Sequence, residues 1–292
     1  MKLFVTGSGS FIGRRLFAHC KALGIETIGI DSAVITEAHS HQADIRDPAI
    51  ADLIPEDSIV VHLAAISRDP DCRADPRSAF DINVNGTLNL AAAAEKRKAR
   101  QFVFASSEWV YGDVSNKGVQ LEDDPINVTT MKSEYALTKI VGEQCLRLTC
   151  KLPAVTILRF GIVYGPRPSN WSAVEALFHA VQEKELVSVG SLATGRRFIH
   201  VDDIVAGILK TVERTGFEIF NLSGNTIITL RDVVEQSMEL LGRRPTLDEK
   251  NPTVISIRNP DNTKARKNLG WEPKIGLRDG LATLLPHSSN KS

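Results

Sequence analysis

The first sixteen residues constrain the fold of this chain more than any other stretch. Leu3 to Val5 is a short apolar run of β-favouring residues, and a turn rich in glycine and serine follows it. From Phe11 onward, apolar residues recur at helical spacing. A strand, a tight glycine turn and a helix N-terminus together can hold a pyrophosphate, because backbone N–H groups and the positive end of the helix face the phosphates. The opening stretch therefore predicts a dinucleotide-binding turn.

The glycine spacing departs from the strict G-x-G-x-x-G pattern, because the glycines are Gly7, Gly9 and Gly13. An ordinary turn between a strand and a helix is therefore the alternative. Asp31 favours the nucleotide: it ends the second predicted strand about 20 residues after the turn, where a carboxylate accepts hydrogen bonds from both ribose hydroxyls. A carboxylate repels a 2′-phosphate, so Asp31 indicates NAD rather than NADP. Capping of its own loop is the other role open to Asp31.

The composition argues against several classes of partner. The 292 residues include 35 Lys and Arg and 35 Asp and Glu, so the formal net charge is zero. No long-range field would gather nucleic acid or a membrane surface, and no apolar run approaches the roughly 18 residues that span a bilayer. The four cysteines show no metal-ligand spacing. We therefore expect no metal site, and buried thiols in a reducing cytoplasm.

Alternating strands and helices predict an α/β fold with a doubly wound parallel sheet, the Rossmann arrangement. Apolar runs that exit into small residues, near 58–66 and 101–105, indicate strands covered on both faces. Gly86 and Thr87 interrupt a predicted helix, which suggests that another segment approaches closely there. Beyond about residue 160 the elements become shorter and mixed. We expect a dinucleotide-binding domain and a smaller C-terminal mixed α/β substrate-binding domain, formed by 1–160 plus about 197–224 and by about 161–196 plus 225–292, respectively.

Tyr135 and Lys139 stand four residues apart on a predicted helix and so share one of its faces. A tyrosine with a pKa of about 10 is a poor base at neutral pH. A buried ammonium beside the phenol favours the phenolate, and bringing the pKa near 7 takes about 3 units, or roughly 4 kcal/mol. Ser107, at a strand exit, can hydrogen-bond the same substrate oxygen. Together the three residues predict proton transfer from a hydroxyl while a hydride leaves for the cofactor.

Several motifs in this order make the chain similar to a known family. It resembles the extended short-chain dehydrogenase/reductase family, in particular its NAD-dependent sugar-nucleotide epimerase/dehydratase group. The likeness covers nearly the whole chain. It rests on the segments 5–13, Asp31, 44–45, 62–65, 83–87, 106–107 with 111–112, Tyr135 with Lys139, 164–166, Arg196 with 198–203, and 264–271.

The resemblance implies a role for each matched residue. Tyr135 would be the base, Lys139 would hold the nicotinamide ribose and tune Tyr135, and Ser107 would orient the reacting hydroxyl. The residues expected around NAD are Gly7, Ser10, Phe11, Ile12 and Gly13 at the pyrophosphate, Asp31 at the ribose, Asp44 and Ile45 at the adenine, Leu63, Ala64 and Ala65 along the cofactor channel, and Asn83 on the nicotinamide side.

The chain departs from the family pattern at several places. Ser10 replaces a usual glycine, so its Cβ would crowd the pyrophosphate or its hydroxyl would bond to it. Ile162 stands where the family often has an Asn that touches the nucleotide-sugar, which weakens that assignment. Arg196 matches the position that commonly pairs with the substrate diphosphate, a fitting use of a forked donor. The usual later Arg has no clear match, and Lys250 and Arg258 are the candidates to replace it.

Two residues after Ser107 bear on the reaction. Family dehydratases place two acid/base side chains there, whereas this chain has Glu108 and Trp109. One carboxylate beside an indole fits elimination poorly. Glu108 is therefore a candidate lone acid/base or a residue that solvates a turn. Trp109 is a candidate substrate contact, with packing as its simpler role.

We therefore expect a cytoplasmic sugar-nucleotide epimerase with tightly held NAD that acts at C4. The alternatives are an NAD-dependent dehydrogenase/reductase or dehydratase on another sugar or small alcohol, and a non-catalytic NAD-binding protein. The expected partner is a small-molecule substrate, a nucleotide-sugar, with no nucleic acid and no membrane. We expect a homodimer, because the helices near 84–98 and 132–150 would share one outer face and such helices often pair in the family.

Overall fold

Seven parallel strands form the main sheet of the computed structural model, which describes residues 1–34, 39–112, 118–168 and 172–285. The strand order is β11-β6-β5-β4-β1-β2-β3, and every neighbouring pair is parallel. The strands are β1 (Lys2–Thr6), β2 (Glu26–Asp31), β3 (Ser40–Gln42), β4 (Ile59–His62), β5 (Gln101–Ser107), β6 (Ala154–Phe160) and β11 (Gly216–Leu222). The predicted doubly wound parallel sheet is confirmed.

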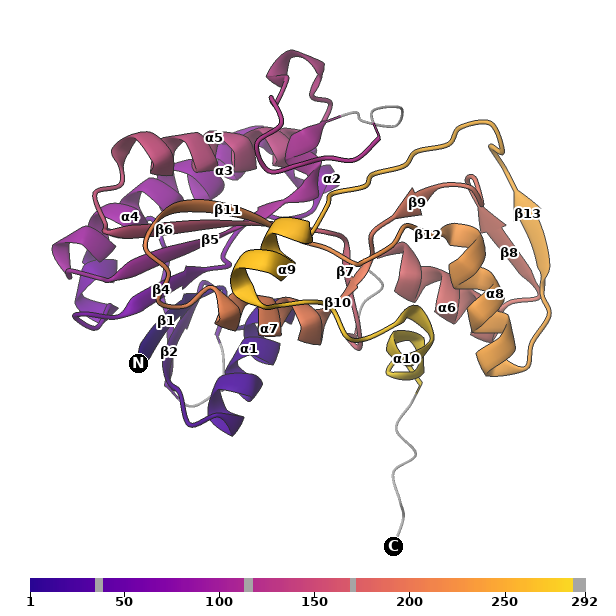
Figure 1. The fold of residues 1–292 in the computed structure, drawn as a ribbon, viewed down its shortest axis with the longest axis horizontal. Helices are drawn as coiled ribbons and strands as arrows, with labels where there is room; N and C mark the ends of the chain where they lie inside the picture. Colours follow the sequence, from indigo (N-terminus) through magenta and orange to yellow (C-terminus); the bar gives the residue numbers. More distant parts are fainter. Residues whose placement is uncertain (35–38, 113–117, 169–171, 286–292) are drawn as a thin grey trace, which may run out of the picture.

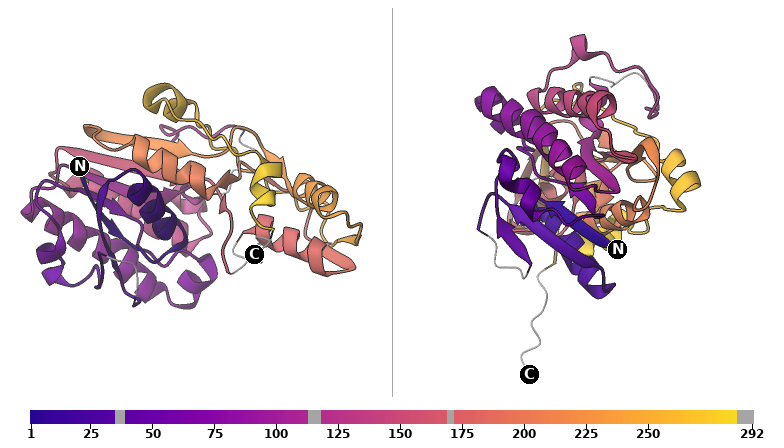
Figure 2. Two further views of the ribbon diagram at one scale, coloured as in Figure 1. Left: turned by 90° about the horizontal axis from the view of Figure 1, so that it is seen from below. Right: turned by 90° about the vertical axis from the view of Figure 1, so that its left-hand side faces the viewer.

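Helices cover both faces of this sheet (Figures 1 and 2). Successive strand side chains point to opposite faces, so Leu3 and Val5 of β1 enter one apolar core and Phe4 enters the other. The first core also receives α1 (Phe11–Ala22), α7 (Val201–Lys210) and α9 (Thr263–Leu269). The second receives α4 (Thr87–Lys96) and α5 (Glu134–Thr149), which pack side by side on one face as the sequence predicted, with α2 (Asp69–Ala74) and α3 (Pro76–Phe80) beside α5.

A π-helical turn, Asp81–Gly86, joins α3 to α4. The close approach expected at Gly86 is confirmed, since a Cβ there would lie 2.7 Å from Ile45 Cδ1. His62 bridges the turn to β1, with Nδ1 2.7 Å from Thr6 Oγ1 and Nε2 2.9 Å from Thr87 Oγ1. Burial lowers the pKa of His62 to about 3, so this histidine stays neutral. The π turn is therefore fixed against the central strands next to the site described below.

A second region follows β6 and lies to the right in Figure 1. It has its own apolar core, in which Val174 and Phe178 pack with Val234 and Met238. Its elements are β7 (Val163–Tyr164) with β10 (Ile199–His200), β8 (Leu186–Val189) with β13 (Thr246–Glu249), β9 (Gly195–Arg196) with β12 (Ile228–Thr229), and the helices α6 (Ala173–Glu183), α8 (Leu230–Leu241) and α10 (Leu277–Ala282). The helix α9, which the predicted division assigns here, instead packs against β11. The two-domain division itself stays a prediction.

None of the described helices is long and apolar enough to cross a bilayer. Within the same residues, no group of three or more His, Cys, Asp or Glu side chains could hold a metal ion.

Candidate active site

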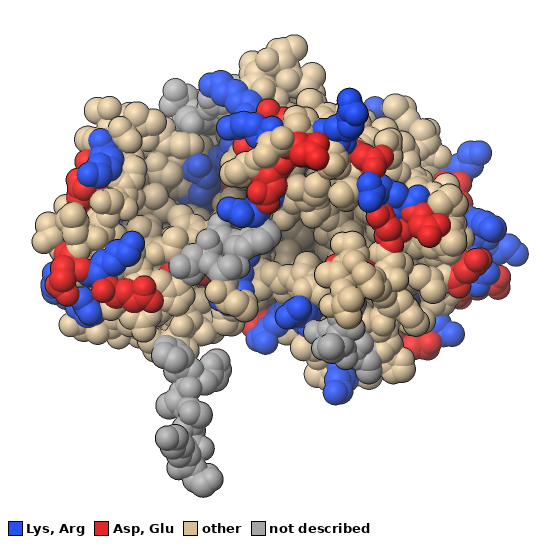
Figure 3. Space-filling model, turned by 180° about the vertical axis from the view of Figure 1, so that it is seen from behind, with Lys and Arg blue, Asp and Glu red and all other residues tan. Residues whose placement is uncertain are grey.

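A cavity of about 1010 Å³ opens beside the glycine turn, at the carboxyl ends of the central strands. The strand order reverses between β1 and β4, which is the place where α/β sheets of this kind bind ligands. The molecule is hollowed near the middle of one face (Figure 3). Most of the residues predicted for the cofactor line the cavity: Gly7, Ser10, Phe11, Ile12, Asp31, Asp44, Ile45, Leu63, Ala64, Ala65, Tyr135 and Lys139.

The glycine turn leaves no room for side chains at two positions. Gly7 has φ +70°, and a Cβ there would lie 2.8 Å from the Ala64 nitrogen. A Cβ on Gly13 would lie 2.2 Å from the Gly7 oxygen, so Gly13 lets α1 pack against β1 and does not itself line the cavity. Ser10 Oγ accepts a hydrogen bond of 3.1 Å from the Gly13 N–H and so caps α1. Its hydroxyl proton can still donate, so the turn fits a dinucleotide diphosphate.

Asp31 holds the glycine turn in addition to lining the cavity. Its Oδ2 accepts from the Gly9 N–H and its Oδ1 accepts from the Ala33 N–H, each at 3.0 Å. The loop-capping alternative is therefore observed. Because an ionised carboxylate has about four acceptor positions, the same side chain can also accept from ribose hydroxyls. Beside it, Asp44 pairs with Arg46 at 2.6 Å, and Arg46 is a cavity residue that sequence reasoning missed.

Tyr135, Ser107 and Lys139 meet where α5 passes the end of β5. Ser133 caps α5 by accepting from the Ala136 N–H at 3.0 Å, which fixes the first turn that carries Tyr135. The Tyr135 phenol and the Ser107 hydroxyl hydrogen-bond to each other. Lys139 Nζ lies 5.8 Å from the centroid of the Tyr135 ring. The structure thus brings together the three residues that the sequence predicted for proton transfer.

The groups of the protein alone do not lower the pKa of Tyr135, so the predicted fall toward 7 stays a prediction for the site with its cofactor bound. Burial raises the pKa of Tyr135 above its ordinary value, and the hydrogen bond with Ser107 opposes this rise only in part. Burial also lowers the pKa of Lys139 to about 8. Burial is the largest cause of both shifts, although Tyr135 keeps part of its surface open to the cavity. An additional positive charge is needed before Tyr135 can act as a base at neutral pH.

Asn83 does not line the cavity but supports a segment of its wall from behind. Its Oδ1 accepts from the Ile66 N–H at 2.8 Å, and its Nδ2 donates to the Ile66 oxygen at 2.9 Å and to Thr138 Oγ1 at 3.0 Å. Thr138 lies on α5 between Tyr135 and Lys139. Asn83 therefore fixes the segment after β4 against the helix that carries both residues.

Glu108 lies buried beside Ser107, with 1% of its surface exposed. Neither carboxylate oxygen has a hydrogen-bond partner, although Arg196 Nε lies 3.8 Å from Oε1. The Arg258 guanidinium lies 4.4 Å from the centroid of the Trp109 ring. Burial raises the pKa of Glu108 to about 7, against the opposing charges of Arg258 and Arg196. A carboxyl group in this setting can exchange a proton near neutral pH.

The structure distinguishes between Arg258 and Lys250, the two candidates for the later substrate contact. Arg258 belongs to the cluster around Glu108 and Trp109, whereas Lys250 is exposed and pairs with Asp248. Lys250 is therefore not brought to the site. Arg196, predicted to meet a diphosphate, donates from Nη1 to the Ser256 oxygen at 2.6 Å and from Nη2 to Ser256 Oγ at 3.1 Å. Ile162 packs against the core of the second region.

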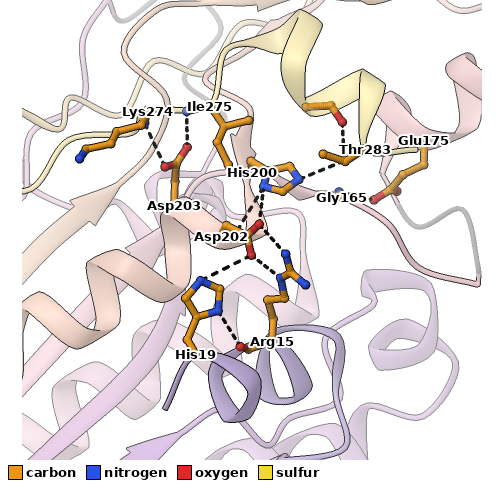
Figure 4. Close-up of polar contacts among 11 residues, drawn as sticks. Arg15, His19, Gly165, Glu175, His200, Asp202, Asp203, Lys274, Ile275 and Thr283 are labelled. Carbon is orange, nitrogen blue, oxygen red and sulfur yellow. Dashed lines mark hydrogen bonds and ion pairs between the residues drawn. The ribbon is translucent and has the colours of Figure 1, made fainter. Parts of the chain in front are cut away.

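Asp202 of α7 contacts Arg15 of α1 and His200 of β10 next to the cavity (Figure 4). Arg15, a cavity residue, donates from Nη2 to Asp202 Oδ2 at 2.7 Å. His200 Nδ1 accepts from the Asp202 N–H at 3.3 Å, and His200 Nε2 lies 3.2 Å from Thr283 Oγ1. Because Nδ1 accepts, the proton sits on Nε2, and burial lowers the pKa of His200. These bonds hold α1, α7 and α10 in fixed positions.

Arg167 forms a second link of this kind that the sequence did not reveal. Its guanidinium lies 4.3 Å from the centroid of the Phe11 ring, and it pairs with Glu175 of α6 at 2.8 Å. Both Phe11 and Arg167 line the cavity. The glycine turn and the second region therefore share one wall of the site.

A glycine turn at the switch point of a parallel sheet, with Tyr135 and Lys139 facing the same cavity and Ser107 beside them, defines an enzyme that works on a bound dinucleotide. The model of the NAD dependent epimerase/dehydratase family matches residues 3–223, and the chain belongs to that family.

Similar proteins agree with this assignment. The chain is 30% identical over 319 residues to the UDP-glucose 4-epimerase of Mycolicibacterium smegmatis, and the match covers 100% of both chains. It is 27% identical over 307 residues to the UDP-glucuronate 4-epimerase of Thermodesulfobacterium geofontis, covering 95% of this chain and 93% of that one. Among solved structures, MoeE5 in complex with UDP-glucuronic acid and NAD has a TM-score of 0.86 at 27% identity, covering 97% of each chain. The protein is an enzyme, and its cofactor is NAD.

Proposed function

We propose that the protein is a sugar-nucleotide epimerase that inverts C4 of a UDP-linked sugar. The observation that carries this proposal is that Tyr135 and Lys139 line the same cavity as the glycine turn, with Ser107 beside the Tyr135 phenol. Relatives with end-to-end similarity are named 4-epimerases, which supports the reaction and the UDP-sugar class. An epimerase needs no second acid/base pair, in agreement with Trp109 after Glu108.

Ser107 and Tyr135 divide the handling of the substrate hydroxyl between them. Ser107 Oγ accepts from the Trp109 N–H at 3.3 Å, which leaves its own proton free to donate. The serine would hold the oxygen of the sugar hydroxyl, and Tyr135 Oη would take its proton and later return it. Lys139 would keep positive charge next to the phenol. When bound, NAD supplies the hydride acceptor and a further positive charge that favours the phenolate.

The fit of the nucleotide-sugar depends on residues of the second region. Arg258 and Arg196 surround Glu108 with more positive than negative charge, which suits a diphosphate or another anionic group. Ile162 supplies no polar contact, so we propose that the backbone and Arg258 recognise the nucleotide in this chain. Arg196 would have to exchange its bonds to Ser256 for contacts to the substrate.

Proton NMR of the anomeric region tests the reaction directly. Purified protein loaded with NAD is mixed separately with UDP-glucose, UDP-galactose and UDP-glucuronic acid. The proposal expects one of these to be converted to its C4 epimer without added cofactor. If all three stay unchanged while NADH absorbance grows with another alcohol, the dehydrogenase alternative replaces the epimerase.

Glu108 favours one second candidate, a dehydratase. Its buried carboxyl group, with no hydrogen-bond partner and a pKa raised to about 7, could exchange a proton in an elimination. The same NMR experiment would then reveal a 4-keto-6-deoxy sugar instead of an epimer. That product should disappear in Glu108→Gln, whereas epimerisation should persist in this variant.

We also propose that the enzyme is a cytoplasmic homodimer that pairs through the face formed by α4 and α5. Leu148 on α5 is 73% exposed, which suits a residue that a second subunit covers. The four cysteines are free, as expected in a reducing compartment. Light scattering that detects only a monomer would rule out the dimer.

A further inference from the structure

Glu143 lies on α5 one turn beyond Lys139 and two turns beyond Tyr135, and its carboxylate is fully enclosed. Its side chain has 0% exposure, and that of its partner Arg159 has 3%. Arg159 donates from Nη2 to Glu143 Oε2 at 2.7 Å and from Nε to Oε1 at 3.1 Å. A bidentate ion pair of this kind fixes the orientation of the carboxylate and balances its charge.

Ser106 connects this ion pair to the catalytic strand. Its hydroxyl donates to Glu143 Oε1 at 2.5 Å, and Ser106 is the residue before Ser107 at the end of β5. The helix and the strand therefore meet at two polar contacts, Glu143 with Ser106 and Tyr135 with Ser107. Gly142 allows this close packing, since a Cβ there would lie 3.0 Å from Phe104 Cζ.

Arg159 continues the network to the segment after β5 and to β11. Its Nη1 donates to Tyr111 Oη at 3.1 Å and to the backbone carbonyl oxygen of Glu122 at 3.0 Å. Tyr111 in turn donates to Asn221 Oδ1 at 2.7 Å, at the end of β11. The charge of Arg159 is thus directed to Glu143 and away from the cavity that Lys139 lines.

The groups that face Lys139 come from several elements. They are Tyr135 and Glu143 on α5, Cys72 on α2, His62 on β4, and the ring of Phe104 on β5, whose centroid lies 4.8 Å from Nζ. His62 is neutral, and burial together with Asp69 and Asp71 raises the pKa of Cys72 to about 11. Near pH 8 neither Cys72 nor Tyr135 is ionised in the protein without cofactor. Glu143 is therefore the negative charge that opposes the desolvation of Lys139.

We propose that Glu143 is a positioning residue of the active site: held by Arg159 and Ser106, it fixes the end of β5 against α5 and keeps the proton on Lys139. This inference rests on the catalytic role proposed for Lys139. Loss of that proton would remove the ammonium from the phenol and from the cofactor, so Glu143 would set the upper pH limit of the reaction.

The test follows Lys139 itself by NMR of protein labelled in its lysine side chains. The Lys139 signal is assigned by its absence from Lys139→Met, and its chemical shift is recorded against pH. The midpoint should lie near 8 in the wild-type protein. It should fall by about one unit in Glu143→Gln, because this variant loses a negative charge that opposes the desolvation of Lys139.

Two variants separate charge from structure. Ser106→Ala removes a hydrogen bond to the same carboxylate but no charge, and Glu175→Gln breaks the other buried ion pair, with Arg167 on α6. Both should keep the wild-type midpoint of Lys139. A Glu143→Gln protein with the wild-type midpoint would overturn the proposal, as would an equal shift in Glu175→Gln.

Glu143→Gln leaves Arg159 buried without its carboxylate, which can prevent folding. The double variant Glu143→Gln with Arg159→Met removes both charges at similar volume. The Lys139 midpoint should again fall, but by less, because the positive charge of Arg159 is lost as well. The titration needs no substrate. It can therefore fail while UDP-sugar epimerisation is observed, and it can succeed on an enzyme whose reaction proves to be a different one.

Discussion

The cofactor half and the substrate half of the site differ in how their polar groups are satisfied. Around the glycine turn, Asp31 accepts two backbone N–H groups and Ser10 accepts one. On the other side, Glu108 is buried with no hydrogen bond to either carboxylate oxygen. The bonded groups of the glycine turn are set in place by folding, although Ser8 Oγ in the same turn is buried without a partner. A buried carboxylate without partners costs more than a neutral hydroxyl and raises the free energy of the folded protein. The comparison indicates that the proposed substrate half, through Glu108, has hydrogen-bonding capacity that folding leaves unused.

The sharpest test of this contrast is Tyr135→Phe, which removes the proposed base between the two halves. Turnover should fall by about 10³-fold, the scale of a lost general base. NAD should remain bound, because the glycine turn is untouched. Turnover is measured by NMR and bound NAD by its release from denatured protein. Near-normal turnover would show that another group takes the proton.

Glu108→Gln should reveal the strain of the substrate half as a dependence of stability on pH. The pKa of Glu108 in the folded protein, about 7, lies above its ordinary value of 4.5. The folded state therefore binds more protons in this range, and wild-type stability falls as pH rises from 4.5 to 7. A difference of this size is worth about 3 kcal/mol.

The measurement is the free energy of unfolding in urea at pH 4.5 and at pH 8. The variant should match the wild type at the lower pH and exceed it at the higher pH. An equal difference at both pH values would contradict the assignment of the strain to the ionised carboxylate.

Gly13→Ala probes the cofactor half, where the limit is space rather than charge. The new Cβ would lie 2.2 Å from the Gly7 oxygen, so α1 or the turn must move. The free energy of unfolding should fall by about 1–3 kcal/mol, and NAD should bind more weakly. Gly190→Ala is the matched control, because no heavy atom lies within 4 Å of its Cβ. Equal losses in both variants would remove the packing argument.

Asp31→Asn should have the smallest effect of this series. The amide oxygen can keep one of the two backbone bonds, but the charge that would bind the ribose hydroxyls is lost. NAD affinity should fall about tenfold, as expected for one hydrogen bond to a charged group, and discrimination against NADP should weaken. Calorimetric titration with each dinucleotide measures both. Unchanged NAD affinity would leave Asp31 with its loop-capping role alone.

Sequence reasoning worked best where the signal is local. The strand expected around Leu3 to Val5 and the helix expected from Phe11 onward are β1 and α1, because each pattern lies within a few adjacent residues. The glycine turn and the spacing of Tyr135 and Lys139 are also contained in short stretches. The long strands of the sheet were recognised from their apolar character.

The missed features depend on contacts between distant residues. Arg167 reaches the cavity by stacking on Phe11, and Glu143 is held by Arg159 of β6 and Ser106 of β5. The short strand β13 is defined by its pairing with β8 rather than by its composition. The effect of burial on the pKa of Tyr135 could not be predicted, because the sequence shows which charges are present but not how deeply they are buried.

The central claim is that Tyr135 becomes a base only when NAD joins Lys139 beside it, and this chain allows a direct test. It has three tyrosines. Burial raises the pKa of Tyr111 to about 12 and also raises the pKa values of Tyr135 and Tyr164. The near-ultraviolet absorbance of tyrosinate is titrated with and without NAD, using Tyr135→Phe as the blank. One phenolate that appears near neutral pH only with NAD, and is absent from the variant, is the predicted result. A titration that NAD leaves unchanged would contradict the account.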